Sequence, residues 1–377
     1  MRNLVYVFSL FIGIYGLQAQ TKRDSIVKYM RSNLVISGKN PVHSIQTYIS
    51  NEQESICEAV GFADAIRDSA AKLNQFKIAS ITKTMTAAVV MQLQEEGRLN
   101  INDHISKYLK DVPFVNVYDI HILKGIRYGN DLTIKHLLEH SSGLADLFTD
   151  SQVRFYLNEY LNKNQEWNPQ KLMIKYFRYR LNKKAHFAPG NGFFYSDVNY
   201  FLLGIIIEKI TGKSLAQNYR QRIFEPLGMK DSYLEYCELP SGTRKLAHSF
   251  FGRRDISRTL NTSYDWAGGG VISTTKDLSE FVKALFNGQL FKKDSTIIQM
   301  ITMKPHPLKS GRISYYGLGI YQYSFNGDIY YGHGGFWGSL MAWCPAKKIA
   351  FCGSINQVNS PFDTYKFIEN LIKIFNS

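Results

Sequence analysis

Ser80 and Lys83 stand three residues apart in the segment Ser80-Ile81-Thr82-Lys83. Serine is a weak nucleophile until a neighbouring group takes its proton. A lysine three residues further along a helix lies on the same face, and a desolvated amine gives up its proton readily enough to act as a base. A serine at a helix start also has free backbone N–H groups nearby, which suit a developing oxyanion. The spacing therefore predicts acyl transfer with Ser80 as the nucleophile.

The Ser-x-x-Lys spacing alone does not select Ser80, because short motifs recur by chance. The sequence contains this spacing at Ser25–Lys28, Ser69–Lys72, Ser80–Lys83 and Ser273–Lys276. Ser25 follows a candidate signal peptide, Ser69 lies in a polar, loop-like stretch, and Ser273 is typical of a helix cap. Only Ser80 joins a short extended segment, 76–79, to a long helix with an apolar face. The context therefore favours Ser80.

The elements around Ser80 suggest how the chain positions it. Met85, Ala88, Val89 and Leu93 recur at helical spacing, and Gly97 follows, so we expect a helix over Ser80–Glu96. Residues 42–62 alternate as a hairpin does. Further helices are predicted over Thr133–His140, 276–286 and Phe362–Phe375, with an apolar segment over Tyr200–Ile210. Strands are predicted over Tyr315–Tyr323, Ile329–Tyr331, Ser339–Cys344 and Ile349–Ile355.

Sheet-forming segments thus lie near both ends of the chain, with helices between them. Neither end can bury both faces of its strands alone, so the two must meet in one α/β layer. We expect a single hydrolase domain over 20–375. Its α/β part would comprise about 20–100 and 265–377, with a helix-rich insertion over about 101–264.

Several further motifs follow Ser80 in order along the chain. They are His136-Leu137-Leu138-Glu139-His140-Ser141-Ser142-Gly143, Phe187-Ala188-Pro189-Gly190, Tyr195-Ser196-Asp197, Pro226-Leu227-Gly228-Met229, Gly268-Gly269-Gly270 and Gly332-His333-Gly334-Gly335. With these motifs the chain resembles the serine β-lactamase-related family in its class C branch, over roughly residues 40–375. That branch includes class C β-lactamases, D-alanyl-D-alanine carboxypeptidases, D-amino-acid peptidases and esterases. The resemblance implies a β-lactamase/transpeptidase-like fold with an antiparallel sheet flanked by helices.

The resemblance also implies roles for individual residues. Ser80 would be acylated, and Lys83 and Tyr195 would share the work of the general base, with the phenol activated by nearby positive charge. His333 occupies the place where β-lactamases of this branch carry a lysine, and would tune Tyr195 or the substrate electrostatically. The oxyanion hole would use the backbone N–H groups of Ser80 and Phe336. We expect His140 to be structural.

Two departures from the family pattern concern the substrate-binding residues Asp197, Gly334 and Gly335. The second motif usually ends in Asn, whereas an ionised Asp197 can only accept hydrogen bonds and would favour a charged Lys83. The third motif commonly carries Lys-Thr-Gly or His-Thr-Gly in enzymes whose substrates bear a terminal carboxylate. Here the lysine is His333 and Gly334 has no hydroxyl. We therefore expect weak hydrolysis of classical β-lactams.

Three functional interpretations remain open. The first is a D-Ala-type peptidase acting on cell-wall peptides, or a related esterase or amidase on small acyl substrates. The second is a β-lactamase proper. The third is a penicillin-binding or sensor module that keeps the fold without the chemistry. The missing carboxylate contacts favour an esterase or amidase, and the expected export favours a peptidase.

Composition and the N-terminus bound these interpretations. Lys and Arg exceed Asp and Glu by 45 to 31, which gives a net charge of +14. We interpret this charge as a solvated basic surface, with an anionic envelope polymer or lipid surface as the alternative binding partner. No nucleic-acid-binding motif accompanies it. Arg2, the apolar run from Leu4 to Leu17 and Ala19 are typical of a signal peptide over residues 1–19. We expect an exported protein, periplasmic or extracellular. It would carry neither a lipid anchor nor a membrane span after cleavage.

The four cysteines, Cys57, Cys237, Cys344 and Cys352, lack metal-ligand spacing. Cys344 and Cys352 are predicted to flank one hairpin turn in offset register, so we expect free thiols. No metal or organic cofactor is expected, because side chains supply both the nucleophile and the base. The expected partner is a small peptide, ester or amide, peptidoglycan fragments included.

Overall fold

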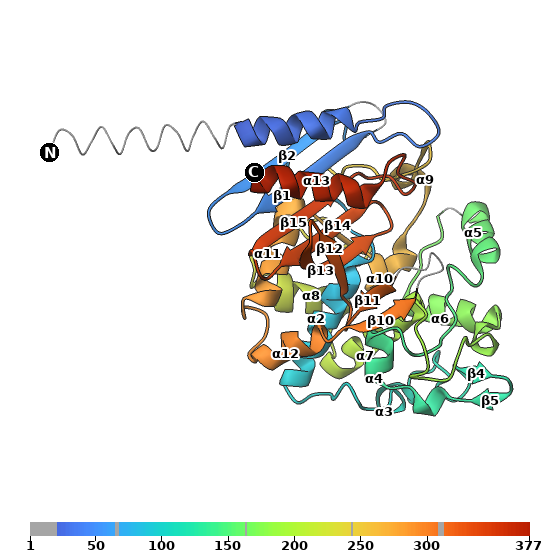
Figure 1. Cartoon of the computed structure of the whole chain (residues 1–377). Helices are drawn as coiled ribbons and strands as arrows, with labels where there is room; N and C mark the ends of the chain where they lie inside the picture. Colours follow the sequence, from blue (N-terminus) through green and yellow to red (C-terminus); the bar gives the residue numbers. More distant parts are fainter. Residues whose placement is uncertain (1–20, 65–67, 163, 243, 308–312) are drawn as a thin grey trace, which may run out of the picture.

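An eight-stranded antiparallel sheet forms the centre of the molecule (Figure 1). The computed structural model describes residues 21–64, 68–162, 164–242, 244–307 and 313–377. Within them the strands follow the order β10-β11-β12-β13-β14-β15-β1-β2. Their bounds are β1 Ser44–Ser50, β2 Ser55–Gly61, β10 Lys304–Pro307, β11 Ile313–Tyr316, β12 Tyr321–Phe325, β13 Asp328–Gly335, β14 Ser339–Cys344 and β15 Ile349–Ser354.

The two ends of the chain meet where β1 pairs with β15, from Gln46 opposite Ser354 to Ser50 opposite Ala350. Alternating side chains of these strands face opposite sides of the sheet. On one side, Ile45 and Ile49 pack with a helix over residues 21–32 and with α13, Thr364–Asn376. Figure 1 draws these two helices, one blue and one red, across the same face of the sheet.

The other face of the sheet is covered by α2 (Ile81–Glu95) and α11 (Thr275–Phe286). The side chains of α2 are buried along most of its length, because α7 (Asp197–Thr211) and α10 (Trp266–Gly269) pack against the side that the sheet leaves free. The further helices are α3 Ser106–Leu109, α4 Ile134–Leu138, α5 Gln152–Leu161, α6 Pro169–Arg178, α8 Leu215–Tyr219, α9 Ile256–Thr259 and α12 Asp294–Met300.

A small second sheet supports the segment that precedes Ser80. It has the order β3-β9-β6, with β3 Phe76–Lys77, β9 Val271–Ser273 and β6 Tyr233–Leu234. Beyond β3, the Ile78 N–H donates to the carbonyl of Val271 at 3.1 Å, so the chain stays extended until the helix begins. Two short hairpins complete the strands: β4 Ile122–Leu123 with β5 Ile126–Arg127, and β7 Phe250–Phe251 with β8 Arg254–Asp255.

The predicted fold class is confirmed, with three local corrections. The single strand expected over Tyr315–Tyr323 is two strands, β11 and β12, joined by a turn in which Gly319 has φ +74°. The strand expected over Ile329–Tyr331 runs on to Gly335, past glycines that hide it from a propensity argument. β10 was not expected, because it contains Pro305 and Pro307; it lies at the edge of the sheet, where proline is tolerated.

Cys344 and Cys352 lie on the β14–β15 hairpin in the predicted offset register. Cys344 faces Ile349 across the pair, and Cys352 faces Met341. The sulfurs of both, and those of Cys57 and Cys237, are free. The predicted signal peptide, residues 1–19, falls outside the described residues. Within the described ranges, the helices are too short or too polar to cross a membrane.

Candidate active site

Ser80 is the residue that begins α2, immediately after the extended segment that follows β3. Ala79, just before it, has φ 47°, a left-handed conformation that a residue with a Cβ seldom adopts. Such strain persists only where the surroundings impose it, and it is concentrated at functional sites. The sharp turn lifts the half-buried Ser80 side chain away from the core that buries its helix neighbours.

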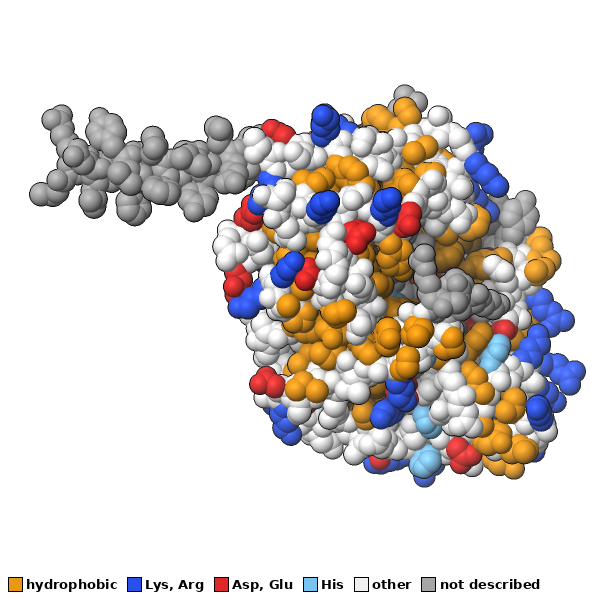
Figure 2. Space-filling view, in the orientation of Figure 1, with side chains coloured by type: hydrophobic (Ala, Val, Ile, Leu, Met, Phe, Trp, Pro, Cys, Tyr) orange, Lys and Arg blue, Asp and Glu red, His pale blue; other side chains and the backbone are white. Residues whose placement is uncertain are grey.

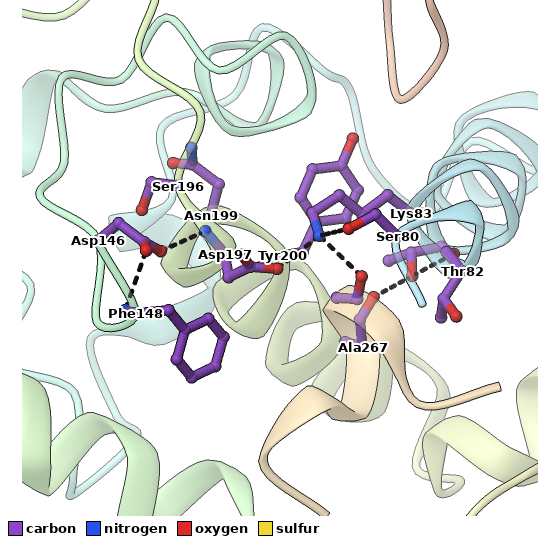
Figure 3. Close-up of polar contacts among 12 residues, drawn as sticks. Ser80, Thr82, Lys83, Asp146, Phe148, Ser196, Asp197, Asn199, Tyr200 and Ala267 are labelled. Atoms are coloured by element: carbon purple, nitrogen blue, oxygen red, sulfur yellow. Dashed lines mark hydrogen bonds and ion pairs between the residues drawn. The ribbon is translucent and has the colours of Figure 1, made fainter. Parts of the chain in front are cut away.

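Lys83 lies one turn further along α2 and is fully buried. Its Nζ is 3.1 Å from Ser80 Oγ, 2.5 Å from Asp197 Oδ1 and 2.7 Å from the carbonyl oxygen of Gly268 (Figure 3). The ammonium has three N–H donors, and these three oxygens match their number. Elements from three parts of the chain, α2, α7 and α10, therefore converge on one amine.

The other Ser-x-x-Lys pairs have different environments. Lys72 forms an ion pair with Glu58 at 2.9 Å. Ser273 is buried, with its hydroxyl 2.8 Å from that of Ser232, while Lys276 is exposed. Ser25 lies on the surface helix over residues 21–32 and donates to the carbonyl of Thr21.

Tyr195 lies beside the same amine, with the centre of its ring 4.9 Å from Lys83 Nζ. Burial raises the pKa of Tyr195 well above its usual value, and the charge of Asp197 adds to this, while a hydrogen bond with Ser80 lowers it. We expected nearby positive charge to activate the phenol. The pKa shift is opposite to that expectation: desolvation and the charge of Asp197 favour the neutral phenol, so it keeps its proton at neutral pH.

His333 is on β13, with its ring centre 6.2 Å from that of Tyr195. The ring is buried: Nδ1 is 2.7 Å from the Gly334 carbonyl oxygen, and Nε2 is 3.3 Å from the Tyr316 hydroxyl. Burial lowers the pKa of His333 to about 3, with a smaller contribution from the charge of Lys83. The expected electrostatic role is therefore corrected, because a neutral imidazole offers no positive charge to Tyr195 or to a substrate.

The end of β13 approaches the backbone just before Ser80. Ser339, which faces Gly335 across the β13–β14 pair, donates from Oγ to the Ile78 carbonyl at 3.0 Å. A Cβ on Gly335 would lie 2.2 Å from that carbonyl oxygen, so this approach requires glycine. The backbone N–H groups of Ser80 and Phe336 come two residues after Ile78 and one residue after Gly335 along the chain. Within the described part of the chain, neither donates to another backbone group.

Gly334 differs from its neighbour, because a Cβ there would have room. The nearest atom would be Tyr323 Oη at 3.6 Å. Successive residues of a strand point to opposite faces, so Gly334 faces away from the side occupied by His333 and Gly335.

Asp146 is a site residue that the sequence analysis missed. Its Oδ2 accepts the Asp197 N–H at 2.7 Å, and its Oδ1 accepts the Phe148 N–H at 2.9 Å (Figure 3). Burial, and then the charge of Asp197, raises the pKa of Asp146 to about 7. An aspartate followed by a tight turn is a local signal in the sequence. Its contact with Asp197, 51 residues further along the chain, has no such signal in the sequence.

His140 and Asp265 complete the surroundings of the site. His140 Nδ1 accepts the Ser196 N–H at 3.2 Å, and its ring lies 4.2 Å from that of Tyr195, so it holds the segment that carries Tyr195. Asp265 is a second carboxyl, half-buried, whose pKa desolvation raises to about 7. In the described ranges, no three His, Cys, Asp or Glu side chains are grouped so as to hold a metal ion.

Comparison with known proteins places this geometry in context. The family model described as Beta-lactamase matches residues 43–371. "Protein flp" of Staphylococcus aureus (strain MW2) is 28% identical over 243 residues, which is 63% of this chain and 44% of that protein. "Penicillin-binding protein 4*" of Bacillus subtilis (strain 168) is 27% identical over 279 residues, 69% of this chain and 55% of that protein. The chain thus spans about half the length of these curated relatives.

Solved structures match over more of their length. A D-stereospecific amidohydrolase from Streptomyces sp. superposes with a TM-score of 0.75 at 24% identity, covering 91% of this chain and 97% of that one. The D-amino acid amidase from Ochrobactrum anthropi SV3 gives a TM-score of 0.76 at 21% identity, covering 95% and 98%. At these identities the likeness concerns the fold.

Proposed function

The chain belongs to the Beta-lactamase family, and from that premise we propose that it is an exported serine hydrolase that works through an acyl-enzyme at Ser80. One observation carries the proposal: the fully buried Lys83 amine lies 3.1 Å from Ser80 Oγ at the strained start of α2. A nucleophile within hydrogen-bonding reach of a base, which is itself held by a third group, is the arrangement that covalent catalysis requires.

The proposed reaction has two halves. Ser80 Oγ attacks the carbonyl carbon of the substrate while its proton passes to the base. The N–H groups of Ser80 and Phe336 would stabilise the oxyanion. Collapse of the tetrahedral intermediate expels the amine or alcohol, which takes the proton from the base. Water then attacks the acyl-enzyme and releases the acid, with Ser80 recovering its proton.

Lys83 and Tyr195 are the candidate bases, and Asp197 opposes both. Its carboxylate forms an ion pair with the ammonium of Lys83 and raises the pKa of the Tyr195 phenol. We therefore propose that Asp197 slows acylation at neutral pH. Lys83 is the favoured acceptor, because it contacts Ser80 Oγ directly and the phenol is held in its protonated form.

For the substrate, we propose an amide or ester without a free carboxylate beside the bond that breaks. His333 is neutral, and Gly334 has no side chain and faces the other side of β13, so neither supplies the contacts that a terminal carboxylate would need. The similarity in fold to a D-amino acid amidase and a D-stereospecific amidohydrolase supports this class. A D-Ala carboxypeptidase is the second candidate, favoured by the predicted export signal.

A matched pair of substrates separates the two candidates. The same acylated D-Ala-D-Ala peptide is offered with a free C-terminal carboxylate or with a C-terminal amide, beside a Ser80→Ala control. We expect the amide to be cleaved faster, and cleavage of both to depend on Ser80. Preference for the free carboxylate, together with release of D-alanine from pentapeptide muropeptides, would instead establish the carboxypeptidase.

A second experiment tests whether Ser80 is a reactive nucleophile. A fluorophosphonate probe should label the protein at Ser80, as found by peptide mass spectrometry, and should not label the Ser80→Ala variant. Absence of labelling from a folded protein would favour the non-catalytic binding module. A labelled protein inactive on both peptides would leave the serine hydrolase proposal intact and refute only the substrate class.

A further inference from the structure

Helix α5 carries an apolar stripe on the side that faces solvent. Val153, Leu157 and Leu161 are 80%, 55% and 69% exposed. They are spaced by four residues and so lie along one line of the helix, opposite the buried Phe155 and Glu159. A single exposed leucine is ordinary on a protein surface. Three in line over two turns form a continuous apolar edge with nothing in the described structure covering it.

A basic hollow adjoins this stripe. It measures about 730 Å³, and Arg154, Arg180, Lys183 and Lys184 line it together with Asp150. Val153, the first residue of the stripe, lines it too, so the two features are continuous. Figure 2 shows blue and orange side chains together at the right-hand edge of the molecule, where Figure 1 draws α5 and α6.

The charge of the hollow is not neutralised from within. Asp150 Oδ2 lies 2.9 Å from His186 Nε2 and accepts the Asp146 N–H at 2.8 Å, so this carboxylate is already engaged. None of the four cations forms an ion pair with any residue that the structure describes. Arg154 lies over the Tyr179 ring, 5.9 Å from its centre, which leaves its charge available to a ligand.

We propose that α5 and this hollow form a docking surface for an anionic phospholipid membrane. The three apolar side chains would enter the boundary between headgroups and acyl chains, as the apolar faces of interfacial helices do. The four cations beside them would bind lipid phosphates, and the overall charge of +14 adds a long-range attraction. The surface would hold the enzyme flat against a membrane without any spanning segment.

The combination of features distinguishes a membrane from other occupants. A soluble polyanion or a wall polymer would bind the cations but would leave the apolar stripe in water. A second copy of the chain could cover the stripe, but it would bring its own four cations against the first four. A lipid surface satisfies both at once, because its phosphates and its acyl region lie a few ångströms apart.

The experiment measures partitioning of the full chain onto vesicles of phosphatidylcholine alone or with phosphatidylglycerol. Two variants remove the two features separately. The charge variant combines Arg154→Glu, Arg180→Glu, Lys183→Glu and Lys184→Glu; the stripe variant combines Val153→Gln, Leu157→Gln and Leu161→Gln. Matched controls change exposed side chains elsewhere to the same extent: Lys110, Lys209, Lys230 and Lys366 to Glu, and Ile36, Ile126 and Ile298 to Gln.

We expect binding to phosphatidylglycerol vesicles that weakens with salt and falls at least about tenfold in each test variant, but not in the controls. Labelling of Ser80 by a fluorophosphonate should be unchanged, which shows that the variants fold. The proposal is overturned if the stripe variant binds vesicles as the unchanged protein does. It is equally overturned if the charge variant loses only the binding of inorganic polyphosphate, or if the stripe variant only dissociates a dimer in sedimentation.

Discussion

Asp197 Oδ1 lies 2.5 Å from Lys83 Nζ, so the base nearest to the nucleophile is held in an ion pair within the protein. The same carboxylate raises the pKa of Tyr195, the other candidate base. Asp197 itself lies at the start of α7, where a negative charge is favoured by the helix dipole. Its backbone N–H donates to Asp146 Oδ2. One carboxylate thus forms an ion pair with one candidate base and raises the pKa of the other.

Replacing Asp197 with Asn should therefore speed acylation at neutral pH. The amide can still accept a hydrogen bond from Lys83, but it no longer stabilises the ammonium or raises the Tyr195 pKa. We expect the fluorophosphonate labelling rate at Ser80 to rise with pH in the unchanged protein. In Asp197→Asn this rise should occur at lower pH, with a gain of about tenfold at neutral pH. Stopped-flow or gel-based labelling over a pH series measures both.

The control is Asp111→Asn, which removes an exposed carboxylate elsewhere and should leave the profile in place. A slower rate in Asp197→Asn across the whole pH range would refute this assignment. It would mean that the carboxylate assists the base.

Gly268→Ala should displace the ion pair without changing a charge. A Cβ at this position would lie 2.7 Å from Asp197 Oδ1 and 3.4 Å from Lys83 Nζ. One of these side chains must therefore move. We expect this misplacement of a group beside the nucleophile to lower kcat/KM at least about tenfold. The adjacent Gly269→Ala is the matched control, because its Cβ would meet Asp265 at 3.3 Å instead. Equal loss in both variants would show that the effect comes from α10 and not from the ion pair.

The sequence predicted a helix starting at Ser80 and strands near both ends of the chain, because both depend on local patterns. Ser80 was selected by the strand-to-helix change around it, and β14 and β15 by alternation of apolar residues. The electrostatics were not predictable in the same way. Tyr195 lies beside Lys83, and His333 lies near Tyr195, but the protonation of both depends on burial, and burial depends on aromatic and helical neighbours from distant segments.

Asp146 shows most clearly that contacts between distant segments cannot be predicted from local sequence patterns. Its local turn is visible in the sequence, yet its influence on the site arises through Asp197, which folding brings against it. The β11–β12 turn was missed for a related reason. Gly317 and Gly319 lie against α12 and α2, where a Cβ would come too close. The need for glycine at this turn therefore becomes visible only when these neighbouring helices are known.

Cephalosporins should be poor substrates. The β-lactam carboxylate needs a cation or a hydroxyl at the third motif, and a neutral His333 and Gly334 supply neither. We expect turnover of a chromogenic cephalosporin to be at least about a hundredfold slower, in kcat/KM, than cleavage of the amide peptide. The Ser80→Ala variant gives the background. Efficient cephalosporin turnover would contradict both this prediction and the proposed substrate class.

His333 should make the protein less stable in acid. Its pKa is about 3 when folded and near its ordinary value when unfolded, so below about pH 6.5 only the unfolded chain takes up the proton. The free energy of unfolding therefore falls as the pH drops toward 3. Between about pH 7 and about pH 4.5, His333 should account for about 2 kcal/mol of this loss.

His333→Gln isolates that contribution, because the glutamine amide can donate a hydrogen bond but does not titrate. Asp146 and Asp265, whose pKa values are raised to about 7, act in the opposite direction, since they favour the folded state more as the pH falls. They are present in both proteins and cancel in the comparison. Urea denaturation should show the variant losing less stability than the unchanged protein on acidification. A constant difference between the two proteins over this pH range would mean that His333 is not held neutral by burial.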